Sequence, residues 1–244
     1  MDMGNDSLPP SLDLGRGTPP SEPGFIPAWL RQTPGEHRWP AAIAILAAVA
    51  LQLSLPGHLA PRPRFLLPGI ELLLFVFLVI GNPVRFSRDW KVLRYAAISL
   101  VAVASVATAW SAVLLVQRLV TDDKIRPLDL LLWGGAIWLT NVIVFALWFW
   151  EMDRGGPVSR ACADNVHPDI LFTPMTVPEM VHRDWEPGFV DYLYLSFTNA
   201  TAFSPTDTLP LSRWAKLTMM AESAVSLLTV VLIVARAVNV LGPG

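Results

Sequence analysis

A group of oxygen-bearing side chains ends a short apolar segment in the last quarter of the chain. Residues 189–203 begin apolar and aromatic and then become rich in hydroxyl and amide groups. Hydroxyl, amide and carboxylate oxygens can replace the hydration water of a cation, and rings of acidic side chains favour cations over anions. Groups of this kind could contact a cation, and the residues that carry them are Thr198, Asn199, Thr201, Ser204, Thr206 and Asp207.

Glu222 is a second candidate, because it lies close to the start of an apolar run at residues 217–235. An ionised side chain inside a membrane is costly unless it is paired or faces water. We expect Glu222 to accept hydrogen bonds from the backbone of the preceding short segment; the alternative is a structural carboxyl that is protonated or paired with an arginine. Glu71, near the start of an earlier apolar run, is expected to reach the lipid headgroups.

Acid–base chemistry is offered mainly by two histidines, His167 and His182, in an acidic stretch of the chain. A separation of fifteen residues is not a metal-ligand signature, and no serine-hydrolase, zinc-protease, P-loop or dinucleotide motif occurs. The single cysteine, Cys162, cannot close an intramolecular disulfide and lacks the partners of a thiolate metal site. We therefore expect no enzymatic activity, no metal site and no cofactor.

Composition shows what kind of chain must position these residues. Of its 244 residues 53% are hydrophobic and 16% charged, and the mean hydropathy is +0.46. Soluble domains are closer to a quarter charged, so the composition is typical of a membrane protein. A net charge of −2 leaves no basic excess for a phosphate backbone, which argues against a nucleic-acid partner.

Five apolar runs organise the chain. About 20 apolar residues are needed to cross a bilayer, so the runs at 95–116, 130–150 and 217–235 are expected to span it. The runs at 41–55 and 65–81 are shorter and are limited by Pro56 and Pro68, so they are short tilted helices or a hairpin that does not fully cross. The segment 189–203 is too short to span and is a candidate re-entrant element.

Two polar regions complete the organisation. Residues 1–40 hold eight of the 22 prolines and five of the 15 glycines, which predicts a disordered tail without a cleavable signal. Residues 152–187 are predicted to form an acidic loop outside the membrane. If all four early runs cross the membrane, the tail and this loop lie on the same side.

A family resemblance is found around the short segment. The sequence DYLYLSF at 191–197, followed by Thr201, Asp207 and Pro210, resembles the pore helix, filter and exit of the tetrameric potassium-channel superfamily. The family pattern is D-x-L-Y-x-S-F-x-x-x-T-T-V-G-Y-G-D-x-x-P, and the spacing matches it without a gap. RWAKL at 213–217, Glu222 and ARAV at 235–238 are similar to the inner helix of bacterial members with two helices per pore module.

The resemblance implies a filter at Thr201, Ala202, Phe203, Ser204, Pro205, Thr206 and Asp207, supported by Thr198, Asn199 and Glu222, with Ser226 at the position of a hinge glycine. The chain departs from the family at the filter itself, where AFSPT replaces TVGYG and no glycine remains. Phe203 and Pro205 do not favour the carbonyl ladder that selects potassium. As an alternative, Ser204 begins an interfacial helix as its N-cap, with Pro205 at the first helical position.

The resemblance also implies an architecture and a function. We expect an all-α, polytopic membrane protein of the bacterial cytoplasmic membrane, forming a homotetramer around a re-entrant pore loop. Residues 41–120 would be accessory helices, and 127–241 a pore module with outer helix 127–151, acidic loop 152–187, pore helix and filter 188–207 and inner helix 211–241.

The expected function is passive conduction of monovalent cations with weak or altered selectivity. The expected partners are further copies of the chain, the lipid bilayer and monovalent cations. An alternative is a non-conducting scaffold or sensor that Phe203 and Pro205 plug. A less favoured alternative is a membrane-embedded enzyme that uses His167 or His182.

Overall fold

The computed structural model describes residues 26–80, 90–121, 126–165, 167–202 and 207–241. Four of the predicted filter residues, Phe203, Ser204, Pro205 and Thr206, lie outside the described residues, as do residues 1–25 of the predicted tail. The alternative in which Ser204 caps a helix also falls outside them.

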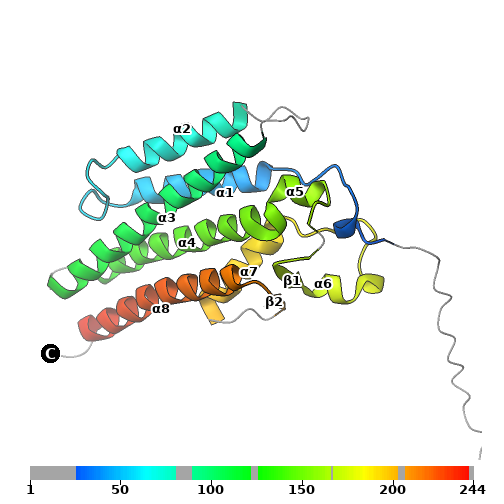
Figure 1. Cartoon of the computed structure of the whole chain (residues 1–244). Coiled ribbons are helices and arrows are strands. Elements are labelled where there is room, and N and C mark those ends of the chain that lie inside the picture. Colours follow the sequence, from blue (N-terminus) through cyan, green and yellow to red (C-terminus); the bar gives the residue numbers. More distant parts are fainter. Residues whose placement is uncertain (1–25, 81–89, 122–125, 166, 203–206, 242–244) are drawn as a thin grey trace, which may run out of the picture.

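Long apolar helices pack side by side (Figure 1): α1 (Trp39–Ser54), α2 (Leu66–Ile80), α3 (Trp90–Thr121), α4 (Pro127–Met152) and α8 (Arg213–Leu241). Helices α3, α4 and α8 are long and apolar enough to cross a membrane, whereas α1 and α2 are shorter. The predictions of a mostly helical chain, of three apolar runs long enough to span a membrane and of two shorter ones are therefore confirmed. These features fit a membrane protein.

Helix α2 exposes its apolar side chains and buries its single charged one. Leu73 is 69% exposed, while Glu71 is 1% exposed and faces the protein, as does the buried Gln52 of α1. The expectation that Glu71 reaches the headgroups is therefore wrong. The physical reason is that a helix surrounded by hydrocarbon turns its one polar side chain toward other helices.

A polar cap covers one end of the bundle; we use this name for residues 153–188 and 207–212. It contains η2 (Asp153–Gly155), α5 (Pro157–Ala161), α6 (Thr173–Thr176) and η3 (Pro178–Met180). Strands β1 (Ile170–Phe172) and β2 (Thr208–Pro210) form an antiparallel pair with Ile170 opposite Pro210. The segment predicted as an acidic loop is thus built from short helices and a strand.

Residues 26–38 lie against this cap, and we name this segment the strap. It contains the short helix η1 (Ala28–Leu30), in which Ala28 is buried. The Thr33 N–H donates to the Ala161 carbonyl at 3.0 Å, and the Arg31 side chain pairs with Asp184. The prediction of a disordered tail is therefore wrong for residues 26–38, since specific polar contacts fix them. The strap and the cap lie at the same end, as expected if the helices before the cap form two antiparallel pairs.

Helix α7 (Phe189–Ala202) enters the bundle from the cap between α4 and α8 (Figure 1). The Ser196 hydroxyl donates to the Val142 carbonyl of α4 at 2.7 Å. Val142 lies eleven residues before Asp153 at the cap, which corresponds to about 16 Å along a helix. After α7 the chain is back at the cap in β2. The polypeptide thus enters the bundle and returns to the end from which it came.

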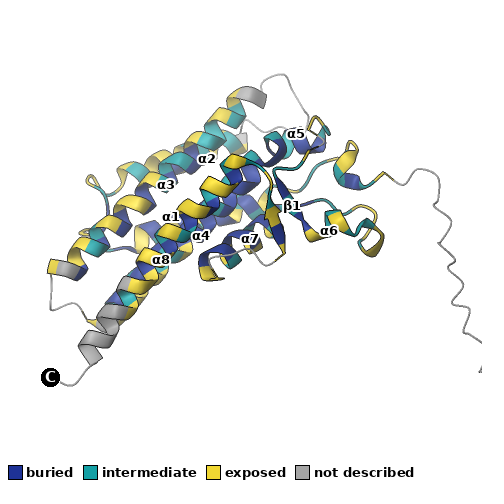
Figure 2. Cartoon of the chain, turned by 60° about the horizontal axis from the view of Figure 1, so that its bottom comes forward, coloured by how far each residue is buried: buried dark blue, intermediate teal, exposed yellow. Residues whose placement is uncertain are grey.

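Burial divides the last helix into two faces (Figure 2). Buried residues recur every three or four positions along α8 and therefore share one face: Ala215, Met219, Glu222, Ser226 and Thr229. The opposite face exposes apolar side chains, among them Leu217, Met220, Leu228 and Val231. Polar side chains therefore point into the protein from a helix whose outer surface is apolar.

Close approach of α4 and α8 depends on one glycine. An ideal Cβ atom on Gly134 would lie 1.9 Å from Cδ1 and 2.8 Å from Cγ1 of Ile233, whereas a Cβ on Gly135 would meet nothing within 4 Å. Small residues commonly allow membrane helices to approach each other in this way. Gly134 therefore sets the spacing between these helices.

We predict that Gly134→Ala is less stable than Gly135→Ala. Both substitutions bring the same gain in helix propensity, but only the first forces Ile233 to move, at a cost of about 1–3 kcal/mol. Thermal unfolding of the detergent-solubilised full chain would measure the difference. Equal midpoints for the two variants would show that α4 and α8 do not pack at this distance.

Candidate functional site

The described residues of the predicted filter lie on either side of residues 203–206. Thr201 and Ala202 are exposed at the end of α7, and the Thr201 hydroxyl donates to the Phe197 carbonyl of its own helix at 2.8 Å. Asp207 is exposed before β2, and its carbonyl accepts from the Thr173 N–H at 3.2 Å. The structure thus fixes both ends of the segment that the sequence identifies as the filter.

Glu222 forms the centre of a buried polar contact between α7 and α8. Its carboxyl group is within hydrogen-bonding distance of the Ser196 hydroxyl and accepts from the Asn199 side-chain amide at 2.7 Å. All three side chains are at most 2% exposed. Glu222 therefore binds the short segment as expected, but through the side chains of α7 rather than through its backbone.

The number of available hydrogens indicates which form of Glu222 fits this site. Ser196 has one hydroxyl hydrogen and lies within reach of two acceptors, the Val142 carbonyl and the Glu222 carboxyl. If Glu222 carries a proton, it donates to Ser196, which then donates to Val142. In that arrangement Asn199 also keeps its bond to the other carboxyl oxygen. A neutral carboxyl thus satisfies every group in the contact, in line with the alternative of a protonated structural carboxyl.

Two further hydrogen bonds extend this polar contact. The Asn199 amide also donates to the Met219 carbonyl at 3.0 Å, and the Asn141 amide of α4 donates to the Ser226 hydroxyl at 3.3 Å. Ser226, predicted at a hinge position, is therefore buried and joined to α4. Thr198 is half-buried and its hydroxyl donates to the Tyr194 carbonyl of its own helix, so it does not join the contact around Glu222.

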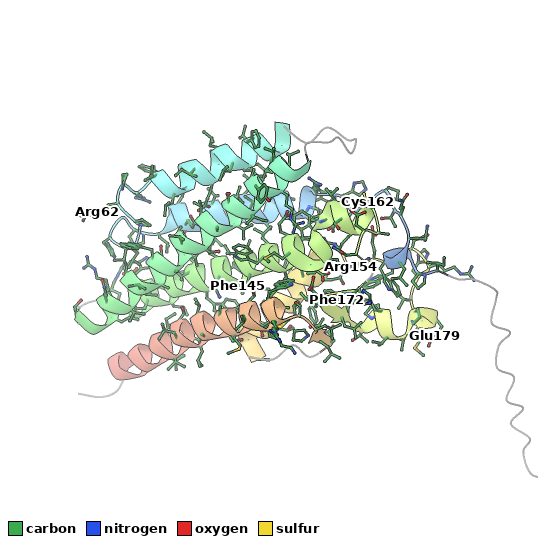
Figure 3. The ribbon with its side chains drawn as sticks, in the orientation of Figure 1. Arg62, Phe145, Arg154, Cys162, Phe172 and Glu179 are labelled. Carbon is green, nitrogen blue, oxygen red and sulfur yellow. The ribbon has the colours of Figure 1, made fainter. Side chains whose placement is uncertain are left out.

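At the cap, the start of α7 is held by a buried carboxylate. Asp153 is fully buried and accepts the Tyr192 hydroxyl at 2.6 Å with one oxygen. Its other oxygen accepts the backbone N–H groups of Asp169 at 3.0 Å and Ile170 at 3.2 Å. Asp153 therefore joins the end of α4, strand β1 and helix α7. Figure 3 shows the neighbouring Arg154 and Phe172 beside this junction.

Arg160 of α5 is a buried positive charge of the cap. Its guanidinium donates to the Trp150 carbonyl at 2.6 Å and the Asp153 carbonyl at 3.0 Å, and it lies 5.1 Å from the centre of the Tyr192 ring. A second nitrogen approaches the Glu36 carboxylate of the strap at 3.3 Å. Arg160 therefore links the strap, α4 and α7 to α5.

Glu36 completes this network from the strap. Burial raises the pKa of its carboxyl, and the attraction of Arg160 and the N–H donors of Trp150 and Phe189 work against this rise. Because the pKa is raised, the packed Glu36 holds a proton more readily than a solvated one. Its contribution to stability is therefore greatest at low pH and falls as the pH rises through the raised pKa.

The two histidines considered for acid–base chemistry are not part of this arrangement. His167 and His182 are exposed in the cap, and the His182 Nδ1 accepts from the Asp184 N–H at 3.3 Å. Within the described ranges, no group of three or more histidine, cysteine or acidic side chains is placed to hold a metal ion.

Comparison of the chain with protein-family models, with curated proteins and with solved structures finds no match. The geometry of the chain's own residues is therefore the basis for any functional assignment.

Sequence reasoning identified Asn199 and Glu222 but missed several residues that hold the site together. Ser196 belongs to the motif DYLYLSF, yet its partners Val142 and Glu222 lie 54 and 26 residues away. Asp153 and Arg160 lie within residues 152–187, for which the sequence predicts only an acidic loop. The available signal for Asp153 and Arg160 was that they are charged residues of opposite sign close to Trp150, where the apolar run 130–150 ends.

We predict that Glu222→Gln retains nearly the stability of the wild type and that Glu222→Leu does not. Glutamine can donate to Ser196 and accept from Asn199, as a protonated glutamate does. Leucine leaves one N–H of the buried Asn199 amide without an acceptor, which costs about 1–3 kcal/mol, while Ser196 keeps its bond to Val142. Thermal unfolding in detergent measures both variants. Equal losses for the two would indicate that Glu222 is ionised.

Proposed function

We propose that this chain is a subunit of a membrane channel that conducts monovalent cations, with residues 201–207 as the constriction. One observation carries the proposal: a half-length helix is held inside a bundle of apolar helices by polar contacts, and the chain then returns to the end from which it entered. A segment of this kind is tolerated in a bilayer only where protein or a water-filled cavity covers its backbone.

The length of α7 supports this proposal. Its 14 residues extend about 21 Å, whereas the hydrocarbon of a bilayer is about 30 Å thick. The end of α7 therefore lies at the depth of the hydrocarbon if the cap lies at the membrane surface. Residues there need polar surroundings, which a water-filled pathway provides.

The outward face of α7 indicates that a single chain is incomplete. Val190, Tyr194, Phe197 and Thr201 recur at helical spacing and are all exposed. In a symmetric assembly this face and the exposed side of α8 would contact neighbouring copies or line the axis. A pore formed by one half-length helix per chain requires several chains, and fourfold symmetry follows from the resemblance to potassium channels.

The chemistry of the segment sets the expected selectivity. Thr201, Ser204 and Thr206 offer hydroxyl groups, and Asp207 offers a carboxylate at the cap end. Around a fourfold axis, Asp207 would form a ring of four carboxylates at the mouth, which favours cations over anions. Without the glycine-containing filter, the pathway would pass partly hydrated cations with weak discrimination between sodium and potassium.

The test is the reversal potential of purified protein in planar bilayers. We expect cation-selective currents under a cation/chloride gradient, little discrimination under a potassium/sodium gradient, and a homotetramer by native mass measurement of the same preparation. In Asp207→Asn the cation preference should weaken, because the ring of carboxylates is lost.

Glu179→Gln is the matched control, because Glu179 is an exposed acid of the same cap outside the proposed pathway. It removes the same charge from the protein surface and should change the reversal potential much less than Asp207→Asn. Equal effects would remove Asp207 from the pathway. Silent bilayers containing confirmed tetramers, or a monomer by mass, would overturn the conduction proposal and favour a non-conducting scaffold or sensor.

A further inference from the structure

The strap contacts the chain just before and at the start of α7. Thr33 donates its hydroxyl to the Glu186 carboxylate at 2.9 Å, and the Trp29 ring packs edge to face on the Trp185 ring at 5.7 Å. Together with the pair between Arg31 and Asp184, these contacts cover residues 184–186. The strap therefore lies along the segment that leads into α7.

Glu36 extends this contact to α7 itself. One oxygen of its carboxylate accepts the backbone N–H of Phe189, the first residue of α7, at 2.7 Å. The first N–H groups of a helix have no partner within the helix, so a carboxylate at this place stabilises the helix start. The other oxygen accepts from the Trp150 indole and approaches Arg160. A residue 153 positions earlier in the chain thus caps α7 and ties it to α4.

Two features oppose docking of the strap. A nitrogen of the Arg154 guanidinium is buried without a hydrogen-bond partner among the described residues, and Arg154 lines the same small pocket as Glu36 and Glu186. The Glu36 carboxyl also loses hydration when it is buried. An unpaired donor and a desolvated carboxyl both cost free energy, so they offset part of the stabilisation that the hydrogen bonds of the strap supply.

We propose that the strap is a releasable clamp that holds the start of α7 against α4 through the Glu36 carboxylate. When the strap leaves, the Phe189 N–H loses its acceptor. The side chains of Arg160 and Trp150 lose the Glu36 carboxylate as a partner. The first turn of α7 then opens more readily, while the Glu222 contact deeper in the bundle still holds the rest of the helix. This inference does not depend on ion conduction.

The chain contains a natural reporter for release of the strap. Cys162 is its only cysteine and is half-buried at the end of α5. It follows Ala161, whose carbonyl accepts from Thr33 and whose side chain would lie 3.2 Å from a Cβ on Gly35 of the strap. Displacing the strap removes these contacts from the end of α5, and the thiol beside them should therefore react faster. Figure 3 shows Cys162 and Glu179 on different sides of the cap.

The experiment compares Glu36→Ala with wild type as the full chain in detergent at one pH. We expect Cys162 to react with a maleimide about tenfold faster in Glu36→Ala, because the hydrogen bonds of one carboxylate are lost. Hydrogen exchange of the backbone at residues 189–192 should accelerate with it, while exchange around Ser196 and Asn199 should not. Thr33 contacts Glu186 and Ala161 rather than α4 or α7. The Thr33→Ala variant should therefore show a smaller increase in the rate of maleimide labelling.

Glu179→Ala is the control, since it removes an exposed carboxylate on the other side of the cap, and both rates should match the wild type. Unchanged labelling of Cys162 in Glu36→Ala would show that Glu36 does not hold the strap. Faster labelling with unchanged exchange at residues 189–192 would show that the strap docks without clamping α7. Either result overturns the proposal.

Discussion

The structure depends on satisfying one buried positive charge, the guanidinium of Arg160. A charge removed from water must be neutralised and hydrogen-bonded, since otherwise burial costs several kcal/mol. The end of α4 meets this requirement with the carbonyls of Trp150 and Asp153, and Glu36 of the strap adds a carboxylate. Arg160 therefore brings three separate segments of the chain together, namely α5, the end of α4 and the docked strap.

The position of α7 follows from that requirement. Tyr192 lies between the two buried charges, because its hydroxyl donates to Asp153 and its ring faces Arg160. The first turns of α7 are thereby fixed to the cap. Deeper in the bundle, the side chains of Ser196 and Asn199 reach Glu222 of α8. Two groups of polar contacts about one turn apart along α7 thus orient a helix that is too short to span a membrane.

Outside these contacts the chain follows the rule for hydrocarbon surroundings. Its outward faces are apolar, and polar side chains such as Asn141 and Ser226 are buried between helices, where they are hydrogen-bonded to each other. Because lipid offers no hydrogen-bond partners, each polar group must find its partner within the protein. The proposed cation pathway is consistent with this rule, since the sequence places the oxygen-bearing side chains of Thr201, Ser204, Thr206 and Asp207 at and just after the end of a helix that is too short to span a membrane.

Hydropathy by itself determined the spanning helices α3, α4 and α8, the shorter α1 and α2 and the short segment before Asp207, because the burial of apolar side chains depends mainly on local composition. Spacing within one motif also identified Asn199 and Glu222 as candidates. The sequence could not show that Glu36 caps α7, that Ser196 reaches Val142, or that Glu71 faces inward. These contacts join residues that are far apart in the chain, or depend on which face of a helix is covered. Only the tertiary structure decides them, since it determines which buried polar groups can satisfy one another.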